Sequence, residues 1–64
     1  MKPIPDSVVR AIHHNLTFFG YSVTYEYVKA EVELIAAGSE PKEIIGMFAA
    51  DMLRKNGYLE VNDA

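Results

Sequence analysis

Apolar side chains recur every three or four residues in three separate stretches of this chain, with polar residues between them. That spacing places the apolar side chains on one face of an α-helix. The residues that we expect to form the core are Val9, Ile12, Leu16, Val28, Val32, Ile35, Ile45, Phe48 and Met52. The pattern predicts an all-α fold, a compact three-helix bundle with helices near residues 6–19, 24–37 and 40–56 and a short extended C-terminal tail.

The ends of the three stretches carry residue types that begin and end helices. A glycine follows each stretch, at positions 20, 38 and 57, where a helix commonly ends in a left-handed residue. Asp6 and Thr24 stand at the start of the first two stretches, and their side chains accept hydrogen bonds from a helix N-terminus. Pro41 is tolerated in the first turn of the third helix. We therefore expect residues 1–64 to form a single three-helix domain.

Composition adds a reason to look for exposed apolar side chains. Half of the 64 residues are hydrophobic, and a chain this short buries only roughly 60% of the surface that its unfolded form exposes. Most of the aromatic residues surround the first interhelical turn. Phe18 and Phe19 point about 100° apart on a helix, and Tyr25 and Tyr27 diverge by about 200°. At least one or two of these rings should therefore be exposed.

The aromatic residues around the first turn are one candidate surface for binding a partner. Exposed tyrosines are typical anchors of protein interfaces. In the alternative interpretation, the rings only add area to an undersized core. The candidate residues are Phe18, Tyr21, Tyr25 and Tyr27.

A second candidate surface surrounds Gly46, which lies inside the third predicted helix. An interior glycine costs a helix about 1 kcal/mol relative to alanine, so it indicates that another helix approaches closely. That helix belongs either to the same chain or to a partner. Met47 and Ala50 complete this candidate surface, and methionine adapts readily to varied partners.

The charged residues disfavour nucleic acid and membranes as partners. Six Lys and Arg stand against nine Asp and Glu, which gives a formal charge of -3, and the basic residues are scattered. Nucleic-acid binding needs a concentrated basic face, because counterion release supplies most of the affinity. No apolar run approaches the roughly 18 residues of a membrane span, and no secretory signal is recognised. We expect a cytoplasmic protein.

The sequence predicts no enzymatic activity, cofactor or metal site. The chain has no cysteine, which removes thiolate chemistry. His13 and His14 are adjacent, so on a helix their rings point about 100° apart and cannot chelate one ion together. The glycines are isolated from one another and form no phosphate-binding loop. Three short helices also offer little room for a small-molecule pocket.

The turn Phe19-Gly20-Tyr21-Ser22 resembles the glycine–aromatic loop of ubiquitin-associated domains. Those domains are three-helix modules that bind ubiquitin through that loop and the third helix. The resemblance implies that Gly20 and Tyr21 lie in the binding loop and that Met52 and Leu53 lie on the binding helix. Phe19 stands where those domains usually carry methionine.

The segment Met52–Val61 is similar to the junction of recognition helix and wing in winged-helix repressors. That resemblance implies DNA binding, which requires Arg10, Lys42, Arg54 and Lys55 to converge on one face. Two hypotheses follow. The leading one is a small non-enzymatic protein–protein interaction module or regulator that binds a partner or a second copy of itself. The alternative is a helix-turn-helix or degenerate winged-helix DNA-binding regulator.

Overall fold

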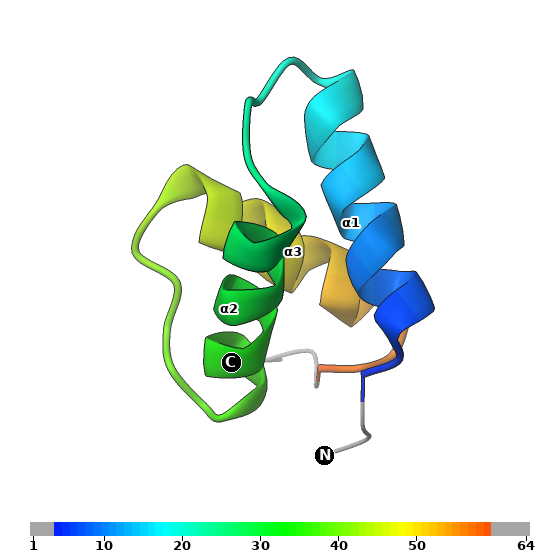
Figure 1. The fold of residues 1–64 in the computed structure, drawn as a ribbon. Coiled ribbons are helices and arrows are strands. Elements are labelled where there is room, and N and C mark those ends of the chain that lie inside the picture. The colour runs from blue at the N-terminus through cyan, green and yellow to red at the C-terminus, as the bar shows by residue number, and fades with distance from the viewer. Residues whose placement is uncertain (1–3, 60–64) are drawn as a thin grey trace.

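A computed structural model of the protein describes residues 4–59, which form three helices and no strand. Helix α1 spans Asp6–Phe18, α2 spans Tyr25–Ala36 and α3 spans Ile44–Lys55. Each helix packs against the other two, and Figure 1 shows α3 crossing behind α2 toward α1. The predicted all-α, three-helix fold is confirmed; α1 and α2 are one and two residues shorter than predicted, and α3 is five residues shorter.

One hydrophobic core lies between the three helices. Seven of the nine predicted core residues are buried, while Phe48 and Met52 are only half-buried. On α3 the core instead takes in Ala49, Ala50 and Leu53, all at most 1% exposed. The buried face of α3 is therefore rotated from the predicted one toward small residues, which let its backbone approach the other helices closely.

Of the two predicted N-cap residues, one is confirmed and one is wrong. The Thr24 hydroxyl accepts a hydrogen bond from the Tyr27 backbone N–H at 3.1 Å, so Thr24 is the predicted cap of α2. The prediction for Asp6 is wrong, because Pro5 is the N-cap residue of α1 and Asp6 lies inside the first turn. All three glycines after the helices have positive φ. After α1, the backbone N–H of Tyr21 donates to the Leu16 carbonyl at 3.0 Å, which closes the helix end.

Helix α3 begins four residues later than predicted. The Tyr27 hydroxyl donates to the Glu43 carboxylate at 3.3 Å, so α3 starts beside the first turn of α2. The segment that joins α2 to α3, residues 37–43, must therefore return along α2, on the left of Figure 1. We call it the connecting segment. Four extended residues advance about 13 Å, against about 6 Å for four helical ones. Pro41 also disfavours a helical conformation at Glu40, so residues 40–43 stay outside the helix.

After α3 the chain folds back on the bundle. The backbone N–H of Tyr58 donates to the Leu53 carbonyl at 2.8 Å. The side chains of Tyr58 and Leu59 pack against the core. The rest of the predicted tail, from Glu60 onward, lies outside the described residues.

Candidate functional site

The end of α1 and the first turn of α3 expose large apolar side chains. We call these four residues the apolar patch; their exposed fractions are 78% for Phe18, 63% for Phe19, 62% for Ile44 and 54% for Met47. Leu16 is fully buried, so Phe18, two residues later and about 200° around the helix, points to the opposite side. The prediction that rings near this turn are exposed is confirmed.

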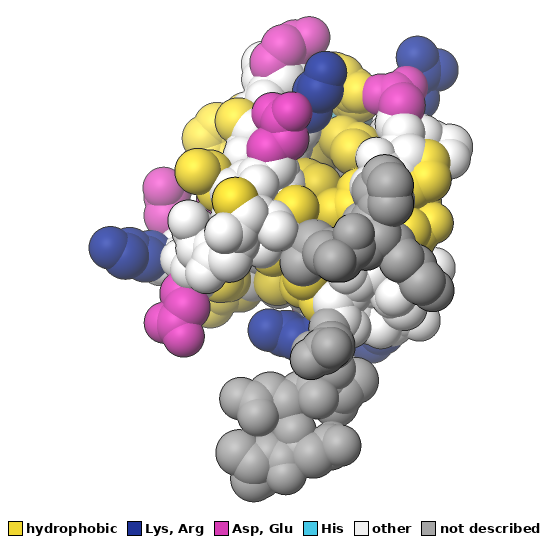
Figure 2. Space-filling view, turned by 90° about the horizontal axis from the view of Figure 1, so that it is seen from below, with side chains coloured by type: hydrophobic (Ala, Val, Ile, Leu, Met, Phe, Trp, Pro, Cys, Tyr) yellow, Lys and Arg dark blue, Asp and Glu magenta, His cyan; other side chains and the backbone are white. Residues whose placement is uncertain are grey.

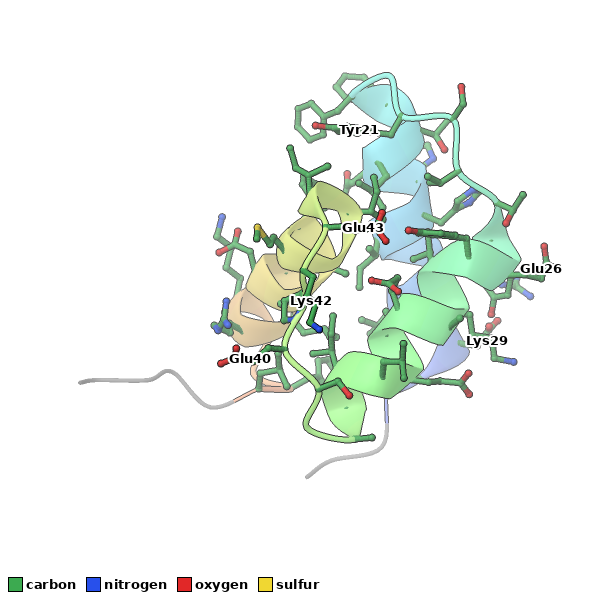
Figure 3. The ribbon with its side chains drawn as sticks, turned by 90° about the vertical axis from the view of Figure 1, so that its left-hand side faces the viewer. Tyr21, Glu26, Lys29, Glu40, Lys42 and Glu43 are labelled. Atoms are coloured by element: carbon green, nitrogen blue, oxygen red, sulfur yellow. The ribbon has the colours of Figure 1, made fainter. Side chains whose placement is uncertain are left out.

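Contacts between aromatic rings join the two halves of the apolar patch. The rings of Phe18 and Phe19 meet edge to face with centroids 5.7 Å apart, and the Phe19 and Phe48 rings are also 5.7 Å apart. Phe48 lies one helical turn after Ile44 and next to Met47, so it connects the end of α1 to the exposed side of α3. In Figure 3, Tyr21 lies at the same end of the molecule, above the start of α3.

The structure distributes the predicted partner-binding residues among three environments. Phe18, Tyr27 and Met47 are exposed, whereas Tyr21 and Tyr25 are half-buried and pack against the core. Gly46 and Ala50 are buried inside the chain. Both positions are covered within this chain, Gly46 by Glu31 of α2 and by Pro41, and neither is part of the exposed surface.

The surroundings of Gly46 show that residues of the same chain cover this position of α3. A Cβ atom added at this position would lie 2.7 Å from Glu31 Oε1 and 2.9 Å from Pro41 Cβ. Both distances are shorter than a normal carbon contact, so only glycine fits without a shift. The close approach that the sequence indicated is therefore made within the same chain.

The hydroxyl groups of Tyr25 and Tyr27 form hydrogen bonds that link α2 to α1 and to the start of α3. The Tyr25 hydroxyl donates a hydrogen bond to the Asp6 carboxylate of α1, and the Tyr27 hydroxyl donates to Glu43 at the start of α3. Desolvation by the surrounding atoms, followed by the negative charges of Glu43 and Glu31, raises the pKa of Tyr27. These two rings hold the helices together, and Tyr27 keeps an exposed fraction of 38%.

The two histidines have separate environments. His13 Nε2 lies 2.8 Å from the Val23 carbonyl oxygen, which ties α1 to the loop before α2, and its ring meets Tyr25 edge to face. His14 is exposed. Among the described residues no group of three His, Cys, Asp or Glu side chains is arranged to hold a metal ion.

An open cleft of about 440 Å³ lies between α2 and the connecting segment. Its apolar wall includes Leu34, Ile35 and Pro41, and its rim carries three carboxylates and one lysine. Figure 3 shows the rim residues Glu40, Lys42 and Glu43 along the connecting segment. The residues that line the cleft are Glu31, Leu34, Ile35, Ser39, Glu40, Pro41, Lys42 and Glu43.

Two of the basic side chains that the structure describes pair with acidic residues of their own helix. Arg10 pairs with Asp6 at 2.7 Å and Lys55 pairs with Asp51 at 3.1 Å, each within its own helix. Figure 2 shows the basic side chains separated from one another on the face that it presents, several of them beside acidic ones. Two of the four cations that the winged-helix resemblance needs therefore already have acidic partners.

Comparisons with known protein families, with curated proteins and with solved structures find no match for this chain. The resemblance to ubiquitin-associated domains therefore depends on the quoted residues alone. Leu53, which that resemblance places on the binding helix, is fully buried. Within residues 4–59, the three helices are too short and too polar for any of them to cross a bilayer.

Phe19 and Ile44 were not among the residues predicted to form the candidate surface. Phe19 continues the apolar stripe of α1, which favours a core position, but α1 ends at Phe18 and Phe19 follows it as the C-cap residue. Ile44 becomes the first residue of α3 only because the helix starts late. The glycine directly after Phe19 was the one available signal that the stripe ends there.

Proposed function

We propose that this protein is a small non-enzymatic interaction module or regulator that binds another protein through the apolar patch. The observation that carries the proposal is the joint exposure of Phe18, Phe19, Ile44 and Met47, each more than half accessible. Single exposed apolar residues are ordinary, but large apolar side chains that gather on one part of a surface are often functional.

The chemistry of the apolar patch supports binding by burial of hydrocarbon. Fully burying a phenylalanine, isoleucine or methionine side chain contributes about 1.5–3 kcal/mol. The two phenylalanine rings already contact each other edge to face, and a phenylalanine has few rotatable bonds to immobilise when it is covered. Met47 is flexible and can adjust to the shape of the partner. None of the four side chains offers a nucleophile or a proton donor, which favours binding over catalysis.

Photo-crosslinking from single positions tests this proposal. A photoreactive phenylalanine analogue replaces Met47 in the apolar patch or, as the control, Glu33, which is exposed on α2. After irradiation in lysate of the source organism, we expect discrete crosslinked protein bands from position 47 and none from position 33. The substitution Phe19→Ser in the Met47-labelled protein should abolish those bands. Equal crosslinking from both positions, or none from either, would contradict the proposal.

A further inference from the structure

We infer that the partner covering the apolar patch is a second copy of this chain, in a two-fold symmetric dimer. The inference rests on the proposed function, because it names the occupant of the same surface. A symmetric dimer buries the same surface on both copies, so that surface must be large enough and must carry little charge. The apolar patch meets these two conditions.

The accessible area of the apolar patch fits a weak dimer. An aromatic side chain has about 150–250 Å² to bury, so Phe18 and Phe19, at 78% and 63% exposure, offer roughly 210–350 Å² together. Ile44 and Met47 raise the area to roughly 300–500 Å² per copy. Two facing copies would remove roughly 600–1,000 Å² from water, which is the range of transient protein–protein interfaces.

Charge along the chain favours contact at this surface. Each copy has a formal charge of -3, so two copies repel each other in most orientations. Residues 11–25 and 44–50, which include the whole apolar patch, contain no Asp, Glu, Lys or Arg. A second acidic copy can approach here without placing like charges opposite one another. The same lack of charge gives a strongly charged partner nothing to pair with.

The two carboxylates that border the patch on α3 are engaged within their own chain. Glu43, directly before Ile44, accepts the hydroxyl hydrogen of Tyr27. Asp51, one turn after Met47, pairs with Lys55 at 3.1 Å. The charge of Asp51 is thus balanced within its own chain, whereas Glu43 bonds a neutral hydroxyl and keeps its negative charge, so repulsion between two copies at this border comes from Glu43.

Sedimentation equilibrium of the purified full chain tests the inference, over about 5 µM to about 1 mM protein, which spans weak affinities. The mean mass should rise from 7.2 kDa for one chain toward twice that value. Met47→Glu should weaken the dimer by about tenfold or more, because it places an unpaired carboxylate in the interface. Circular dichroism of each variant confirms that the helices remain formed.

Leu34→Glu is the matched control. Leu34 is 53% exposed, against 54% for Met47, and it lies seven residues beyond Tyr27 on α2, about 10 Å from the helix end that faces α3. The inference requires dimerisation to survive this change and fail in Met47→Glu. It also requires the dimer to persist or strengthen when salt rises, because screening reduces the repulsion between two acidic copies.

The outcomes separate this inference from the proposed function. A monomer at about 1 mM, together with Phe19-dependent crosslinks from position 47 to a different protein, overturns the dimer and leaves the interaction module in place. A dimer that Met47→Glu does not weaken, or one that salt dissociates, also overturns the inference, since its interface then lies elsewhere. If neither a dimer nor any crosslink forms, both proposals fail.

Discussion

The two sides of helix α3 differ in a way that the hydrophobicity of their residues does not explain. The side facing α2 buries Gly46, Ala49 and Ala50, whereas the opposite side exposes Ile44 and Met47. Glycine is required at position 46 because Glu31 of α2 and Pro41 lie too close to the α3 backbone there for a larger residue. The large side chains left outside then form half of the apolar patch. The closeness of packing on one side thus determines what is available for binding on the other.

The two sides of α3 should differ most in how much the free energy of unfolding falls when a side chain is shortened. Leu53 is fully buried and Ile44 is 62% exposed, and either residue can be shortened to alanine. Leu53→Ala should reduce the free energy of unfolding by about 2–5 kcal/mol, because it removes core contacts and leaves a cavity. Ile44→Ala should change it by no more than about 0.5 kcal/mol. Urea denaturation at low micromolar protein measures both.

One result would contradict the exposure of Ile44. If Ile44→Ala is as costly as Leu53→Ala at a concentration where the chain is monomeric, Ile44 is buried within its own chain and the apolar patch is smaller than described. The wild-type protein at the same concentration is the reference for both. A cost for Ile44→Ala that appears only at high protein concentration would instead follow from burial between copies.

Gly46→Ala changes the side of α3 that packs against α2 and Pro41. It should have the next largest effect on stability. The added methyl group improves helix propensity by about 1 kcal/mol, but it lies within 3 Å of Glu31 and Pro41. The Glu31 carboxylate can swing away, whereas the Pro41 ring moves only with the connecting segment. We expect a net loss of about 1 kcal/mol in the free energy of unfolding. Thermal or urea unfolding measures it.

Two further variants test the cause of that loss. Met47→Ala, on the open side of the same turn, should leave the free energy of unfolding within about 0.5 kcal/mol of the wild type. Glu31→Ala combined with Gly46→Ala should recover part of the loss, since one of the two short contacts is removed. If Gly46→Ala stabilises the protein, the approach of the connecting segment is looser than the structure has it.

The aromatic pair at the end of α1 provides a smaller contrast. Phe19 contacts both Phe18 and Phe48, whereas Phe18 contacts only Phe19 among the aromatic rings of the described residues. Phe19→Ala should therefore cost about 1 kcal/mol of stability and Phe18→Ala about 0.5 kcal/mol. Urea unfolding of the two variants at low protein concentration measures the difference. Equal costs would mean that the contact between Phe19 and Phe48 contributes nothing.

The elements of the fold were predictable from the sequence because their signals are local. The spacing of Val9, Ile12 and Leu16 identifies α1, and Thr24 with its hydrogen bond to Tyr27 begins α2 where the sequence places it. The late start of α3 was predictable locally only as far as Pro41 disfavours a helical conformation at Glu40. It depends on the distance that the connecting segment must cover along α2, which is a property of the packed molecule.

The candidate site was predictable only in part, for the same reason. Phe18 was identified because adjacent aromatic residues on a helix cannot all be buried, and Met47 because it lies beside Gly46 on the third helix; both are exposed. Gly46 and Ala50 were placed on a partner surface because a sequence does not show which chain approaches a small-residue strip. The actual neighbours of Gly46 are Glu31 and Pro41, which precede it by 15 and 5 residues and meet it only after folding.

The smallest expected effect concerns Tyr27, whose hydrogen bond to Glu43 holds the start of α3 against α2. Desolvation and the carboxylates of Glu43 and Glu31 raise the pKa of Tyr27 above the value of 10.0 for a free tyrosine. The folded chain thus binds the phenolic proton more tightly than the unfolded chain does. The stability that this contributes is fully present below the unfolded pKa and is lost as pH rises through the folded pKa.

Ultraviolet absorbance of the phenolate, followed against pH, measures this titration. Tyr27→Phe identifies the contribution of Tyr27 to the tyrosine signal by subtraction. Glu43→Gln should lower the pKa of Tyr27 toward 10.0, because it removes a negative charge that disfavours the phenolate, whereas Glu33→Gln, whose carboxylate is not among the causes of the shift, should not. If Glu43→Gln leaves the titration unchanged, Glu43 does not face Tyr27 in solution. The start of α3, and with it the placement of Ile44 in the apolar patch, would then need to be revised.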